Sequence, residues 1–117
     1  MKMSDYQRLQ KILITGKQML DLVAEEKITP DVLSDSLKAQ WLVTTPLYNI
    51  GEHAYNVSKE LKEQHPDIPW SKVAGLRHRL VHQYDETNWS IIGDIIFNDM
   101  PPFLQQIETV CASMSES

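Results

Sequence analysis

Apolar residues in the first quarter of the chain recur with the period of an α-helix. They are spaced three or four residues apart, and two further apolar residues lie beside them. Such spacing places the side chains on one face of a helix. Ser4 carries a hydroxyl that can cap a helix start, so we expect a first helix from about Ser4 to Glu26. Its predicted buried face consists of Tyr6, Leu9, Ile12, Leu13, Gly16, Met19, Leu20 and Val23.

Two more helices are predicted before residue 62. Thr29 followed by Pro30 fits an N-cap residue and a first helical position, which predicts a short helix over residues 31–36. A longer apolar repeat follows with spacings of 4, 3, 4, 3 and 4, and it predicts one long helix with a seam suited to bundle packing. Pro46 lies within this helix and predicts a kink. The seam consists of Val43, Leu47, Ile50, Ala54, Val57 and Leu61.

The remaining chain contains two further helical patterns and a motif segment between them. The two prolines of residues 65–69 predict a tight connection, after which a helix starts near Ser71 and ends near Tyr84. A polar break over residues 85–88 precedes an apolar helix of residues 89–96. The run Met100-Pro101-Pro102 should break the chain again before the last helix. That last helix carries Phe103, Leu104, Ile107, Val110, Cys111 and Met114 on one side.

No stretch alternates as a half-buried strand would. The predicted fold class is therefore all-α, an up-and-down bundle of four principal helices with short additional helices. The length of 117 residues predicts one domain, residues 1–117, large enough for a core but marginal for a buried catalytic cleft of its own. A partner or a two-fold dimer interface would help to complete such a cleft.

Composition narrows the class of protein. Hydrophobic residues make up 42% and charged residues 23%, as in ordinary globular proteins. The single cysteine, Cys111, excludes an internal disulfide and a cysteine-based zinc site. The first residues lack the apolar region of a signal peptide, and no segment reaches the roughly 18 apolar residues of a membrane span. We expect a cytoplasmic protein with no membrane association.

Residues 70–84 reverse the local charge of an acidic chain. The net charge is −5, yet this segment contains no acidic residue and three basic ones, Lys72, Arg77 and Arg79. In a helix, Arg77 falls in line with apolar residues spaced at 3, 4, 3 and 4. Burying a guanidinium is costly unless a carboxylate or a ligand phosphate meets it. The apolar residues in line with Arg77 are Trp70, Val73, Leu80 and Tyr84.

The segment also carries a recognisable motif, Arg77, four residues, His82, one residue, Tyr84. With residues 49–54 (Asn-Ile-Gly-Glu-His-Ala) and residues 65–70 (His-Pro-Asp-Ile-Pro-Trp), it resembles the HEPN superfamily, specifically the HepT-like toxins. The similarity runs from about residue 5 to residue 110. Two positions depart from the commonest pattern: His78 stands where Asn is frequent, and Gln83 stands where Gly is frequent and could change access to Tyr84.

The resemblance implies a metal-independent endoribonuclease, a phosphodiesterase that needs no cofactor. It implies a homodimer whose composite cleft takes Arg77 and His82 from both protomers to cleave RNA. It further implies a type VII-like toxin–antitoxin pair, in which an MntA-like nucleotidyltransferase antitoxin uses ATP to adenylylate Tyr84 and so silences the toxin.

The residue types suit this chemistry. Cleavage at a 2′-hydroxyl needs a base, an acid and a cation, and histidine and arginine supply them near neutral pH. One His82 cannot easily fill both proton-transfer roles, so a second His82 from the partner, or His78, should supply the other. The expected product is a 2′,3′-cyclic phosphate.

Other readings of these residues stay open. Arg77 can be a structural partner of Glu52, with or without a catalytic role. His78 and His82 have the spacing of a metal pair, but no third ligand is evident, so we expect no metal. Lys72 and Arg79 are either solvated charges or contacts to the RNA backbone.

The net acidity argues against broad nucleic-acid binding and favours narrow RNA recognition. The alternative function is a nonenzymatic helical module that binds a nucleotide or a nucleotidyltransferase partner.

Overall fold

The computed structural model describes residues 2–81 and 87–114; for Val81 it describes the backbone but not the side chain. Its first helix, α1, spans Asp5–Glu25 and confirms the predicted helix. The hydroxyl of Ser4 accepts a hydrogen bond from the N–H of Gln7, whose side chain accepts one from the N–H of Ser4. This capping box satisfies two donors that a helix start leaves free. The buried positions of α1 are Leu9, Ile12, Gly16, Met19 and Val23.

Helix α1 ends in a left-handed residue that is not glycine. Lys27 has a φ of 53°. The N–H of Ile28 donates to the carbonyl of Val23 at 2.9 Å, and the N–H of Lys27 donates to that of Ala24 at 3.1 Å, which is the Schellman pattern. The chain then enters α2, Pro30–Asp35, capped by Thr29 as the sequence predicted.

The long helix predicted through residue 61 is divided in two. Helix α3 spans Leu37–Asn56 and continues through Pro46, and α4 spans Lys59–Gln64. Between them, the N–H and Oγ of Ser58 donate to the Asp5 carboxylate at 2.9 and 2.6 Å. The prediction of one continuous helix was wrong because this contact with α1 begins a new helix at residue 58. All six seam residues are nevertheless buried. A kink at Pro46 stays a prediction.

The motif segment is also divided. Helix α5 spans Trp70–Ala74 and α6 spans Leu76–Val81, with Gly75 between them. The N–H groups of His78 and Arg79 both donate to the carbonyl of Gly75, which marks the start of the second helix. The sequence had predicted one helix here. The apolar residues Trp70, Val73 and Leu80 are buried as predicted, and so is Leu76.

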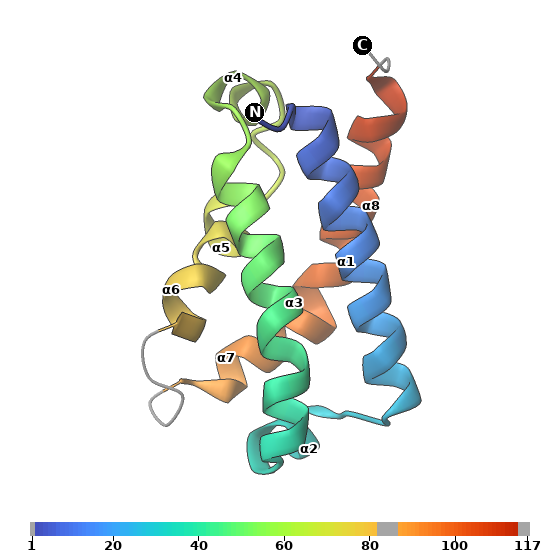
Figure 1. Cartoon of the computed structure of the whole chain (residues 1–117), viewed down its shortest axis with the longest axis vertical. Helices are drawn as coiled ribbons and strands as arrows, with labels where there is room; N and C mark the ends of the chain where they lie inside the picture. The colour runs from blue at the N-terminus through green and yellow to red at the C-terminus, as the bar shows by residue number, and fades with distance from the viewer. Residues whose placement is uncertain (1, 82–86, 115–117) are drawn as a thin grey trace.

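The predicted break at residues 100–102 was wrong. Helix α7 (Trp89–Asp94), a π-helical turn η2 (Ile95–Asp99) and α8 (Met100–Ser113) follow one another without a loop. The N–H of Met100 donates to the carbonyl of Ile95, five residues earlier, which is the π pattern. Pro101 and Pro102 lie in the first turn of α8, where a missing N–H is tolerated. Figure 1 shows that the chain changes direction between α7 and α8.

The helices pack into the predicted all-α architecture, and the described residues contain no strand. Helix α3 lies centrally, with α1 on one side and α5 and α6 on the other (Figure 1). Helix α8 packs on α1, and α7 packs on α2. The fourth principal helix is replaced by the short helices α5 and α6. Of the helices in the described part of the chain, none has both the length and the apolar character of a membrane span.

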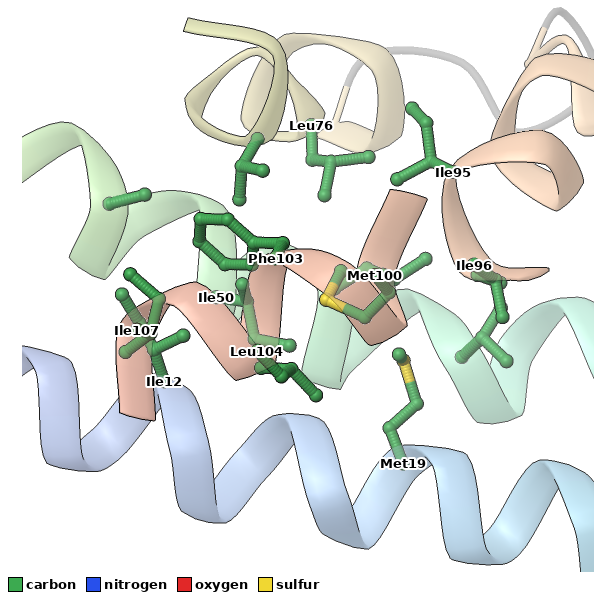
Figure 2. Close-up of a cluster of buried hydrophobic side chains, with 14 of the residues drawn as sticks. Ile12, Met19, Ile50, Leu76, Ile95, Ile96, Met100, Phe103, Leu104 and Ile107 are labelled. Carbon is green, nitrogen blue, oxygen red and sulfur yellow. The ribbon is translucent and has the colours of Figure 1, made fainter. Parts of the chain in front are cut away.

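Phe103 of α8 lies at the centre of the core. Figure 2 shows its ring between Ile50 of α3 and Leu76 of α6, with Met100 beside it. The ring of Trp70 meets it edge to face, with centroids 6.4 Å apart. The start of the motif segment is therefore fixed by aromatic packing, and Arg77 follows two turns later.

Candidate ribonuclease site

Arg77 lies where α6 approaches α3 closely. A Cβ atom added to Gly51 of α3 would lie 3.1 Å from the carbonyl oxygen of Val73, 3.2 Å from Arg77 Cγ and 3.3 Å from Arg77 N. These contacts are tighter than ordinary van der Waals contact, so a side chain at residue 51 would press the two helices apart. Glycine at this position therefore allows α6 to bring Arg77 beside the next residue of α3, Glu52.

Arg77 is oriented by two side chains of α3. Its Nη1 donates to Glu52 Oε1 at 3.3 Å, and its Cζ lies 3.6 Å from the centre of the Tyr55 ring. The Arg77 side chain is 19% exposed and that of Glu52 is 42% exposed. The Nε of Arg77 is buried without a hydrogen-bond partner among the described residues. The guanidinium is thus held in place by one long hydrogen bond and a contact with the Tyr55 ring, and its Nε has no partner among residues 2–81 and 87–114.

The energetics do not favour a purely structural role for this pair. A half-exposed ion pair contributes about 0.2–1 kcal/mol, and a cation over an exposed ring contributes about 0.5–1 kcal/mol. Leaving a buried donor unpaired costs about 1–3 kcal/mol. The gains and the cost are similar in size, so the polar contacts of the Arg77 guanidinium add little net stability. The arrangement is better suited to presenting a fixed cation to an anionic ligand.

The other predicted site residues do not gather around Arg77 in the described part of the chain. His78 and Arg79 are both exposed on α6. Lys72 forms an ion pair with Asp99 of η2 at 2.7 Å, so its charge is already compensated in this structure. His82 and Tyr84, with Gln83 between them, lie outside the described residues. Among residues 2–81 and 87–114, no group of three or more His, Cys, Asp or Glu side chains could hold a metal ion.

Sequence reasoning missed a second polar contact on α3. Arg8 Nη1 of α1 lies 3.3 Å from His53 Nδ1, so the guanidinium donates to an unprotonated ring nitrogen. Burial lowers the pKa of His53, and the positive charges of Arg8 and Lys11 lower it further, against a smaller opposing effect of Glu52. The neutral ring is therefore favoured. His53 lies next to Glu52 in a segment that the sequence singled out, but no spacing pointed to Arg8, 45 residues away.

Comparisons with known proteins agree with the motif. A family model described as Ribonuclease HepT-like matches residues 5–110. A Methanocaldococcus jannaschii protein, named as a candidate RNase, is 32% identical over 87% of this chain and 83% of its own length. A probable ribonuclease HepT of Thermococcus cleftensis is 29% identical over 78% of this chain and 82% of its own.

A third relative covers less of both chains. It is a candidate RNase of Caldanaerobacter subterraneus subsp. tengcongensis, 36% identical over 52% of this chain and 54% of its own length. No solved structure matched the chain. The family model and the relatives' names both indicate a ribonuclease, and the family match extends over most of the chain. This chain therefore belongs to the Ribonuclease HepT-like family of the HEPN superfamily.

Proposed function

We propose that this protein is a metal-independent endoribonuclease toxin that cleaves RNA through Arg77 and His82 within a single HEPN-like domain. The observation that carries the proposal is the state of Arg77. Its guanidinium is half-buried, oriented by Glu52 and Tyr55, and satisfied by one hydrogen bond among the described residues. Membership of a ribonuclease family supports a phosphodiester as the anion that Arg77 meets.

Arg77 acts on the charge that develops during cleavage. Its planar fork matches two phosphate oxygens, and a fixed cation stabilises the phosphorane more than the ground state. Glu52 and Tyr55 orient the guanidinium before RNA arrives, which lowers the cost of reorganisation. Glu52 is therefore a positioning residue in this mechanism.

His82 transfers protons. A neutral imidazole takes the proton of the 2′-hydroxyl, and an imidazolium protonates the leaving 5′-oxygen, which yields a 2′,3′-cyclic phosphate. Because the two roles require opposite protonation states, the cleft takes a second His82 from the other protomer of a homodimer. His78, exposed on α6, is the local substitute if no second His82 is present.

Regulation follows from the same cleft. An MntA-like nucleotidyltransferase antitoxin transfers an adenylyl group from ATP to Tyr84, two residues after His82. The phosphate of the adenylyl group binds the Arg77 guanidinium in place of the RNA phosphate, and so blocks the cleft. Lys72 and Arg79 make secondary contacts with the RNA backbone, Lys72 after exchanging its partner Asp99.

The test is incubation of purified protein with total RNA in excess chelator, after mass spectrometry has shown that Tyr84 is unmodified. Wild type should leave fragments with 2′,3′-cyclic ends, and His82→Ala and Arg77→Ala should leave the RNA intact. His65→Ala is the matched control, because it also replaces a histidine with alanine, but at the end of α4 and not among the proposed site residues. This variant should cleave RNA as wild type does. No cleavage by the unmodified wild type would overturn the proposal and favour a nonenzymatic module that binds a nucleotide or a nucleotidyltransferase.

A further inference from the structure

A cluster of three basic residues, Arg8, Lys11 and His53, lies across α3 from Arg77. Arg8 of α1 and His53 of α3 are both half-buried, and their side chains meet at 3.3 Å between Nη1 and Nδ1. A guanidinium usually pairs with a carboxylate or a phosphate, whereas here it donates to a neutral ring. Lys11, one turn further along α1, is exposed, and its charge reaches His53. Three nitrogen-bearing side chains thus gather where α1 meets α3.

Two carboxylates close to the cluster in the sequence, Asp5 and Glu52, form their hydrogen bonds with other residues. Asp5 accepts hydrogen bonds from the N–H and Oγ of Ser58 at 2.9 and 2.6 Å, and Glu52 pairs with Arg77. In the part of the chain that the structure describes, neither Arg8 nor Lys11 forms an ion pair. Arg8 and Lys11 therefore carry positive charge without an ion-pair partner among the described residues, in a chain of net charge −5.

The cluster and Arg77 lie along one exposed strip of α3, which consists of Thr45, Asn49 and Asn56. Glu52 and His53 are consecutive residues, so they lie at the same level of the helix but point to different sides. Figure 1 shows α1 on one side of α3, and α5 and α6 on the other. Arg8 and Arg77 consequently flank the exposed strip of α3 from opposite sides.

We propose that Arg8, Lys11 and His53 form a second phosphate-binding subsite, which holds the backbone of the RNA substrate as it crosses α3 from the cleavage centre. This inference rests on the proposed function and extends it. The guanidinium of Arg8 binds phosphate oxygens, Lys11 adds a second positive charge, and the ring of His53 keeps Arg8 directed outward until RNA binds. The subsite positions RNA and takes no part in proton transfer.

The experiment measures binding without cleavage. The probe is a fluorescein-labelled ten-nucleotide 2′-O-methyl oligouridylate, which lacks the free 2′-hydroxyl that cleavage requires. Anisotropy titrations over a series of NaCl concentrations give the Kd and the slope of log Kd against log salt. Variants are Arg8→Gln and Lys11→Gln. The matched control is Lys17→Gln, which removes the same charge from α1 at a lysine that pairs with Glu108 at 3.1 Å.

Each subsite variant should weaken binding by roughly threefold to tenfold, and should lower the salt slope by about 0.7 for each phosphate that the variant no longer neutralises. Lys17→Gln should match wild type. Arg8→Lys keeps the charge and should restore the slope, and thermal melts confirm that the variants fold. The inference is overturned if wild type does not bind the probe, or if Arg8→Gln and Lys11→Gln bind it as wild type does.

Two further results separate this inference from the proposed function. His82→Ala should bind the probe as wild type does but should not cleave RNA. If wild type does not cleave RNA and yet binds the probe in a way that depends on Arg8, the proposed ribonuclease activity is refuted and the phosphate-binding subsite is not. A free nucleotide is distinguished with 5′-AMP as a second probe. Arg8-dependent binding of 5′-AMP, with Arg8-independent binding of the oligonucleotide, would refute RNA as the ligand.

Discussion

Gly51→Ala should both destabilise the protein and disturb the site. The added Cβ would meet Val73 O at 3.1 Å, Arg77 Cγ at 3.2 Å and Arg77 N at 3.3 Å. Two of these three atoms belong to the backbone, so relief requires α5 and α6 to move away from α3. Overpacking of this kind costs about 1–3 kcal/mol. The higher helix propensity of alanine stabilises the protein by about 1 kcal/mol relative to glycine, so we expect the free energy of unfolding to fall by a net amount on the order of 1 kcal/mol.

The matched control is the same substitution at another buried helical glycine. A Cβ on Gly93 of α7 would meet only Leu33 Cδ2, at an ordinary contact distance of 3.7 Å. Gly93→Ala should therefore stabilise the protein by about 1 kcal/mol through helix propensity. For a chain of this length, each change corresponds to a shift in Tm of roughly 4 °C, downward for Gly51→Ala and upward for Gly93→Ala.

Urea unfolding followed by circular dichroism measures both free energies. Anisotropy with the 2′-O-methyl oligonucleotide then reports whether the displacement reaches Arg77, since Gly51→Ala should weaken binding and Gly93→Ala should not. If Gly51→Ala is stabilised as much as Gly93→Ala and binds RNA normally, the close approach of α3 and α6 does not position Arg77 and the reasoning fails.

Three other changes test individual contacts. Lys27→Gly should stabilise the protein by about 1 kcal/mol in urea unfolding, because the residue has a φ of 53°; an unchanged midpoint would contradict the Schellman end of α1. Asp5→Ala should cost about 1–3 kcal/mol by the same assay, since two donors of Ser58 lose their acceptor, and a near-neutral effect would show that this contact does not set the start of α4. Because the pKa of His53 lies below its usual 6.5, the unfolded chain binds more protons just below pH 6.5, so stability should fall as the pH is lowered through that range. Between pH 7.5 and 5.5 the melting temperature of His53→Gln should fall less steeply than that of wild type. Identical profiles for the two proteins would count against a lowered pKa of His53.

Local signals in the sequence determined which regions of the chain are helical. Periodic apolar residues, with hydroxyl caps at Ser4 and Thr29, were sufficient to place α1 and α2, because a capping hydrogen bond spans only three residues. Most of the positions predicted on buried faces are buried, whereas Tyr6, Leu13 and Leu20 of α1, and Cys111 and Met114 near the end of the chain, are only partly buried. The motif residues also indicated the family, and an ion pair between Arg77 and Glu52, one of the open readings, is present. The catalytic role of Arg77 stays a prediction.

Contacts between distant residues decided the rest. The division of the long helix depends on Asp5 accepting from Ser58, 53 residues later, and Arg8 meets His53 across 45 residues. Apolar periodicity carries no record of such pairs, because it reports which side of a helix is buried and not which polar group lies opposite. Gly51 shows the same limit at the site itself. The sequence shows a glycine beside Glu52, but only the packing of α6 on α3 shows that the missing side chain is what brings Arg77 within reach.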